Sequence, residues 1–138
     1  MKTEIAFTIL FIIGLIFNFF DWPASGIILI ISLIPLATIY FFAAFYFFCD
    51  KTIKKSNIAL SIISGFLLSI VPVGILFKLQ NWPGAEVNLL SGIITGVILL
   101  PIIWLLKVKA SNDLLNYYKS MIIRTTVLTF TAIFFYVI

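Results

Sequence analysis

Five long apolar runs, separated by short polar segments, make up most of this sequence. They cover residues 5–20, 23–48, 57–79, 87–106 and 121–138. A transmembrane helix needs about 20 predominantly apolar residues. Backbone groups in lipid must find hydrogen-bond partners inside the membrane, and the alternating pattern of a β-barrel is missing from these runs. They therefore predict an all-α fold, a multi-pass transmembrane helix bundle that forms a single membrane domain over residues 1–138.

The composition supports this fold class and excludes several functions. Apolar residues make up 63% of the 138 residues and charged residues 10%, against about 45–50% and about 25% in soluble domains. The lone cysteine, Cys49, allows no intrachain disulfide, and the chain has no histidine. We find no catalytic triad, metal-ligand cluster or phosphate-binding glycine loop, and expect neither enzyme activity nor a cofactor. The basic residues lie between apolar runs instead of on one soluble face, which argues against nucleic acid.

The lysines and arginines predict how the chain is oriented. Eight of the nine lie on the N-terminal side of the membrane if every run spans it: Lys2, Lys51, Lys54, Lys55, Lys107, Lys109, Lys119 and Arg124. Basic residues favour the cytoplasmic side, so we expect a cytoplasmic N-terminus. Arg124, in the first turn of the last run, is expected to snorkel to that surface. The C-terminus lies outside if residues 121–138 span the membrane, and inside if they lie on it.

Two segments with basic residues and the first run have alternative interpretations. Segments 50–56 and 107–119 could attract anionic lipid, although orientation alone explains their charge. The first run could be a cleaved secretory signal, but no A-x-A site follows it.

An internal duplication organises the chain. Four residues recur at a constant offset of 60: Gly14, Phe17, Trp22 and Pro23 match Gly74, Phe77, Trp82 and Pro83. Further matches have an offset of 66: Ser25, Gly26 and Pro35 match Ser91, Gly92 and Pro101. These offsets predict six extra residues after the second Trp-Pro pair. Residues 5–48 and 57–106 are thus predicted to form two parallel hairpin repeats, with residues 121–138 as an additional membrane helix.

Each predicted hairpin turns at a Trp-Pro pair. Proline suits the first turn of a helix, and tryptophan favours the boundary between headgroups and hydrocarbon. We therefore interpret Trp22, Pro23, Trp82 and Pro83 as anchors at the outer interface. Ligand binding is the alternative interpretation of these residues.

Charged residues near the turns form a candidate polar pair. Lys78 is the one basic residue on the outer side, and Asp21 and Glu86 lie near the same level. We hypothesise that Lys78 pairs with Asp21 across the repeats or with Glu86 within its own turn. Snorkelling of Lys78 to water is the simpler interpretation.

Small residues at four-residue spacing indicate close helix packing. They are Ser61, Gly65 and Ser69 in the third run and Gly92 and Gly96 in the fourth. Such residues let helix backbones approach closely. The contacts could lie within the chain or against another subunit, and the first is the simpler expectation.

The second Trp-Pro segment resembles a known family. Residues 74–85 read G-I-L-F-K-L-Q-N-W-P-G-A, and the first copy reads G-L-I-F-N-F-F-D-W-P-A. This pattern is similar to the N-terminal membrane hairpin of the GldL-like family, which belongs to gliding-motility and type IX secretion motors. The resemblance implies an inner-membrane hairpin with a cytoplasmic N-terminus. In that family a carboxylate in the second helix is tied to proton flow, and a histidine precedes the Trp-Pro pair.

The sequence departs from that family at the positions tied to proton flow. Segments 26–48 and 87–106 contain no acidic residue, and Asp21 and Asn81 occupy the position of the histidine. These departures argue against a proton-driven motor. We expect a structural or accessory subunit of a membrane assembly, with the lipid bilayer and other membrane proteins, or further copies of this chain, as partners. A small transporter or channel is the alternative, and would need ionisable groups deep in the spans.

Overall fold

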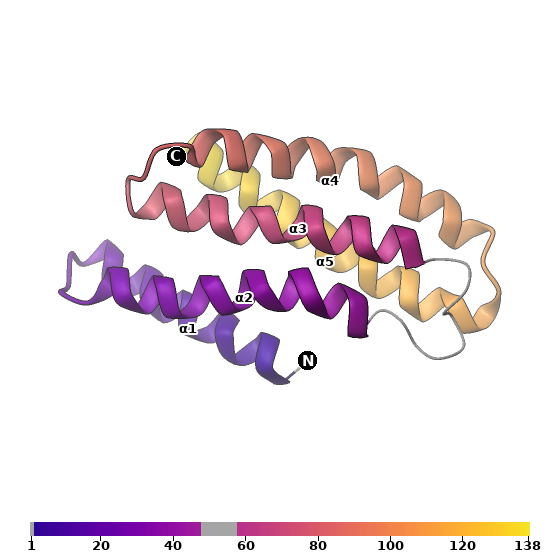
Figure 1. The fold of residues 1–138 in the computed structure, drawn as a ribbon, viewed down its shortest axis with the longest axis horizontal. Helices are drawn as coiled ribbons and strands as arrows, with labels where there is room; N and C mark the ends of the chain where they lie inside the picture. Colours follow the sequence, from indigo (N-terminus) through magenta and orange to yellow (C-terminus); the bar gives the residue numbers. More distant parts are fainter. Residues whose placement is uncertain (1, 48–57) are drawn as a thin grey trace.

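A computed structural model describes residues 2–47 and 58–138, and every element in them is an α-helix (Figure 1). The helices are α1 (Lys2–Phe19), α2 (Ser25–Phe47), α3 (Ile58–Leu79), α4 (Ala85–Val108) and α5 (Asn112–Val137). The predicted all-α helix bundle is therefore confirmed. The basic segment 50–56 and Cys49 lie outside the described residues.

The helices form two antiparallel hairpins and a fifth helix (Figure 1). α1 packs against α2, α3 packs between α2 and α4, and α5 packs against α4 and α3. Both hairpin turns lie at one end of the bundle, with the C-terminus, and the connection between α4 and α5 lies at the other end (Figure 1). No Cα atom of α1 lies within 8 Å of one in α5, so these two helices are not in close backbone contact.

Within residues 2–47 and 58–138, four helices are long and apolar enough to cross a membrane. These spans are Ser25–Phe42, Ala59–Leu79, Ala85–Val108 and Leu114–Val137. The chain is accordingly a membrane protein. The first apolar run, predicted as a fifth span, forms a shorter apolar helix of residues Thr3–Phe19. The difference is physical, because α1 has 18 residues and extends about 27 Å, somewhat less than the roughly 30 Å of hydrocarbon.

The last helix corrects the predicted boundary at residue 121. α5 begins at Asn112 and has 26 residues, so residues 107–119 are mainly helical instead of a loop. Lys107 lies in the last turn of α4 and Lys119 in α5. The first turns of α5 mix polar and apolar residues, so a search for continuous apolar runs does not detect them. Leu128, Ala132 and Phe135 join the core, which shows that α5 packs along the bundle.

The two turns keep one register, which corrects the predicted six-residue insertion. α2 begins at Ser25 and α4 at Ala85, again an offset of 60. The backbone N–H of Trp22 donates to Phe17 O at 3.0 Å, and that of Trp82 donates to Phe77 O at 2.8 Å. The matches at offset 66 therefore reflect similar composition, because they pair residues at different heights in α2 and α4.

Positive backbone dihedrals recur at the same offset. Asp21 has φ 51° and Asn81 has φ 54°, while Ala24 has φ 74° and Gly84 has φ 89°. The left-handed region suits Gly and, less well, Asn and Asp, but is strained for other residues. Ala24 therefore carries a strain that Gly84 avoids.

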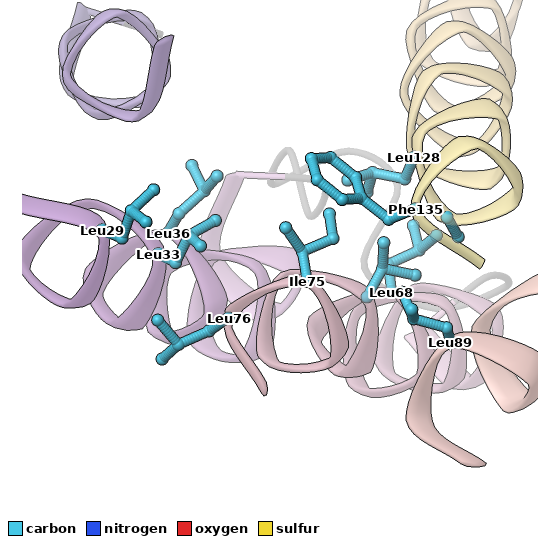
Figure 2. Close-up of a cluster of buried hydrophobic side chains, with 11 residues drawn as sticks. Leu29, Leu33, Leu36, Leu68, Ile75, Leu76, Leu89, Leu128 and Phe135 are labelled. Atoms are coloured by element: carbon cyan, nitrogen blue, oxygen red, sulfur yellow. The ribbon is translucent and has the colours of Figure 1, made fainter. Parts of the chain in front are cut away.

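The core lies between the hairpins and α5. Its buried side chains include Leu29 and Leu33 of α2, Val71 and Ile75 of α3, and Phe135 of α5. Figure 2 shows Ile75 and Leu68 of α3 pointing toward Leu128 and Phe135 of α5. Burial of such side chains from three helices holds the two hairpins and α5 in one body.

Candidate functional site

A cluster of polar side chains joins three helices inside the bundle. Glu4 Oε2 lies 3.1 Å from Arg124 Nη2, which links the first turn of α1 to the middle of α5. The Tyr40 hydroxyl of α2 donates a hydrogen bond of 2.9 Å to Glu4 Oε1. Both carboxylate oxygens of Glu4 are thus engaged by donors from other helices. Hydrogen bonds that involve charged groups are the stronger ones, so this cluster links α5 to α1 and α2, with which it has no close backbone contact.

The cluster lies far from the hairpin turns, measured along α1 and α2. Fifteen residues separate Glu4 from the end of α1 at Phe19, and fifteen separate Tyr40 from the start of α2 at Ser25. At 1.5 Å per residue, both side chains start about 22 Å from the turns. The hydrocarbon layer is about 30 Å thick. If the turns mark one boundary of this layer, the cluster lies in the third of it that is farthest from them.

This depth corrects the expectation for Arg124. Arg124 is the thirteenth residue of α5, so it lies in the middle of the helix instead of its first turn. Its side chain is 21% exposed and is directed to Glu4. An ionised group in the membrane is stabilised by an opposite charge, and Glu4 supplies it. The negative charge also lies in the first turn of α1, where the helix dipole favours it.

A hollow of about 280 Å³ adjoins the ion pair. Its lining comes from α1, α2 and α5: Glu4, Ile5, Thr8, Ile9, Tyr40, Ile123, Arg124 and Val127. The Thr8 hydroxyl adds little polarity to the hollow, because it donates a hydrogen bond of 2.8 Å to the backbone carbonyl of Glu4. The hollow is therefore apolar apart from the charged pair and the tyrosine.

Aromatic and aliphatic side chains close the space between α1 and α5 nearer the turns. The ring centroids of Phe11 and Phe135 lie 6.4 Å apart. Phe11 and Leu15 of α1 pack against the core cluster that contains Leu128 and Phe135. The polar cluster thus does not continue as a row of polar side chains toward the turns.

The predicted interface anchors lie at the turn end of the bundle. Trp22 is 52% exposed and Trp82 45% exposed. Each ring packs edge-on against a phenylalanine, Phe17 for Trp22 at 4.8 Å and Phe77 for Trp82 at 5.4 Å between centroids. Pro23 and Pro83 follow in the same exposed turns. This half-exposed position is compatible with the anchoring role, which stays a prediction.

The candidate polar pair forms no direct bond. Within the described part of the chain, no ion pair of 4.0 Å or less joins Lys78 to Asp21 or Glu86. Lys78 and Glu86 do line one hollow beside the second turn. The link between the two turns comes instead from Gln80, whose side-chain amide donates to Gly26 O at 3.2 Å. Coupling between Lys78 and Asp21 therefore has no direct contact to carry it.

The small residues lie at contacts within the chain. A Cβ on Gly92 would lie 2.6 Å from Val71 Cγ2 of α3, and a Cβ on Gly96 would overlap Thr129 of α5. Ser61, Gly65 and Ser69 of α3 are also buried. The Ser61 hydroxyl shares a short hydrogen bond with the Tyr117 hydroxyl, which links α3 to α5. This spacing therefore serves packing among α3, α4 and α5.

Sequence reasoning missed the ion pair, although a signal for it was present. Glu4 lies directly before the first apolar run and Arg124 lies in the first turn of the last run, where Arg124 was interpreted alone as a residue that snorkels to the membrane surface. Counting back from the Trp-Pro turn places Glu4 inside the apolar layer. An acidic residue at that depth calls for a basic partner.

Comparison with known proteins adds no relative. No protein-family model matches the chain, and no curated protein or solved structure is significantly similar to it.

Proposed function

We propose that this membrane protein is a structural or accessory subunit of an inner-membrane assembly, without enzymatic activity, and that its hairpins are related to those of the GldL-like family. The Glu4–Arg124 ion pair is the observation that supports this role most directly. It fastens the edge helix α1 to α5, although the backbones of these helices stay apart. A fixed α1 presents a stable apolar face to a neighbouring membrane protein.

That face is the surface we assign to the partner. The outward side chains of α1 are mainly isoleucines, each about half exposed: Ile5, Ile9, Ile12, Ile13 and Ile16. β-Branched side chains lose little rotamer freedom when they pack, so they suit a helix–helix contact. The orientation of the chain follows from its lysines, which support a cytoplasmic N-terminus.

Purification of the full chain in mild detergent tests this proposal. We expect a second membrane protein at fixed stoichiometry, and expect Ile9→Trp or Ile16→Trp to release it. Val97→Trp and Ile98→Trp, at exposed positions of α4, are the matched controls and should retain the partner. A monomeric chain that retains no partner, or equal loss in both sets, would count against the proposal.

A small transporter is the second candidate, because the ion pair and Tyr40 line a hollow inside the apolar layer. Ionisable groups at such depth often mark ion pathways. The phenylalanines nearer the turns weigh against a continuous path. Liposomes that contain the purified chain distinguish the two roles: transport predicts a proton or ion flux that Arg124→Gln abolishes, and the structural role predicts no flux.

A further inference from the structure

The second hairpin turn forms a hollow of about 420 Å³ at the end of the bundle. Its lining comprises Phe77, Lys78, Asn81, Trp82, Pro83, Gly84, Ala85, Glu86 and Val87. The half-exposed Trp82 in this lining favours the boundary between headgroups and hydrocarbon. We therefore expect the hollow to open where lipid headgroups meet the protein.

Two opposite charges line this hollow without a protein partner. Neither the Lys78 ammonium nor the Glu86 carboxylate forms a hydrogen bond or ion pair with another described residue. Lys78 comes from the last turn of α3 and Glu86 from the first turn of α4. The site thus offers a cation on one wall and an anion on the other. Phe77 and Val87 add apolar surface beside them.

We propose that this hollow binds the headgroup of a phospholipid with a primary ammonium, namely phosphatidylethanolamine. The Lys78 ammonium pairs with the phosphate, and the Glu86 carboxylate accepts hydrogen bonds from the ethanolamine N–H groups. Charge-assisted hydrogen bonds are short and strong. A choline headgroup carries the same charge but has no N–H donor, so Glu86 discriminates between the two lipids. The acyl chains lie along Phe77 and Val87.

The first hairpin turn provides an internal comparison. At the offset of 60, Lys78 corresponds to Asn18 and Glu86 to Gly26. The first turn therefore carries no charge at either position, and Gly26 O already accepts a hydrogen bond from Gln80. The proposed site belongs to the second turn and does not depend on the function proposed above.

Native mass spectrometry of the full chain in mild detergent tests the site. The probes are phosphatidylethanolamine and phosphatidylcholine with identical acyl chains, and soluble phosphoethanolamine. We expect the unmodified chain to prefer the ethanolamine lipid. Lys78→Gln should lower the affinity for both lipids by about tenfold, since a hydrogen bond to a charged group contributes about a factor of ten to an equilibrium constant. Glu86→Gln should remove most of the preference, because the ethanolamine lipid loses a charge-assisted hydrogen bond whereas the choline lipid loses only the weaker attraction between charges.

Controls separate binding from folding. Asn18→Gln and Lys109→Gln change polar residues away from the hollow and should leave both affinities intact. Lys78→Arg keeps the charge and should retain binding, so it shows whether a loss in Lys78→Gln arises from the charge or from misfolding. Equal affinity of the unmodified chain for both lipids would overturn the proposal. So would a preference that survives undiminished in Glu86→Gln, or phosphoethanolamine binding as tight as that of the lipid.

Discussion

Glu4 and Arg124, 120 residues apart in the sequence, form an ion pair of 3.1 Å between the first and last helices. Each side chain is about one-fifth exposed, 20% for Glu4 and 21% for Arg124. Tyr40 completes the group from α2. α1 and α5 share no close backbone contact, so this polar group adds a side-chain link between them to the packing of α1 against α2 and the core.

Loss of one member of this pair should destabilise the protein. Glu4→Gln or Arg124→Gln leaves the other charge without its partner in the apolar layer. We expect each change to lower the free energy of unfolding by about 1.5–3 kcal/mol, the usual contribution of a hydrogen bond to a charged group. Denaturation in mild detergent measures the effect.

Apolar replacement of both partners is the informative control. Because no charge is then left alone, Glu4→Leu with Arg124→Leu should cost less than either single change to glutamine. Lys109→Gln, at an exposed position between α4 and α5, should have little effect. A loss in the double leucine variant equal to the sum of the losses in Glu4→Leu and Arg124→Leu would show that the two side chains are not coupled.

Exchange of residues between the two turns should have opposite effects. Ala24 has a φ of 74°, where a side chain is strained, whereas Gly84 has a φ of 89° with nothing within 4 Å of the Cβ position. We expect Ala24→Gly to stabilise the protein and Gly84→Ala to destabilise it, each by about 1 kcal/mol after the entropy of glycine is included. Thermal unfolding in detergent measures both, and shifts of the same sign would contradict the shared register.

Gly96 should not tolerate even one methyl group. Its Cβ position overlaps Thr129, so Gly96→Ala forces α4 and α5 apart. Overpacking of this kind costs about 1–3 kcal/mol. Thr129→Ala in the same chain removes two of the three obstructing atoms, Oγ1 and Cγ2, and should restore part of the stability, as a double-mutant cycle would measure. If Thr129→Ala gives no rescue, the two helices do not meet at this point.

The ends of the bundle should lie on opposite sides of the membrane. A chain with Cys49→Ser and a new cysteine at Pro83 should react with an impermeant maleimide in sealed cells, because the hairpin turns are predicted to lie outside. A cysteine at Asn112 should react only after permeabilisation. A reporter fused to the C-terminus should share the side of Pro83, since α5 ends near the turns (Figure 1). Labelling of Asn112 in sealed cells would reverse this orientation.

The bounds of the apolar runs predicted those of α1, α2, α3 and α4 closely, because a continuous apolar run must form a helix over its whole length to cross the membrane. The start of α5 was wrong by nine residues, at Asn112 instead of Met121. Its first turns mix Leu114 and Leu115 with polar residues, a pattern that packing against α4 stabilises but that run length does not detect.

The register of the repeat and the partners of Glu4 are two features that could not be predicted correctly from the sequence. Matching Ser25 and Gly26 with Ser91 and Gly92 gave an insertion that the turns do not contain, because short apolar motifs recur by composition. The partners of Glu4 could not be found from spacing, since they come from the distant helices α2 and α5. Contact between such residues depends on how the helices cross, which only the folded bundle determines.

The shortness of α1 has a consequence for the lipid around the protein. α1 has 18 residues and α4 has 24, so their lengths differ by about 9 Å. A bilayer adapts to hydrophobic mismatch by local thinning. We therefore expect the membrane to be thinner beside α1 than beside α4, and proteins with short spans to be favoured on that side.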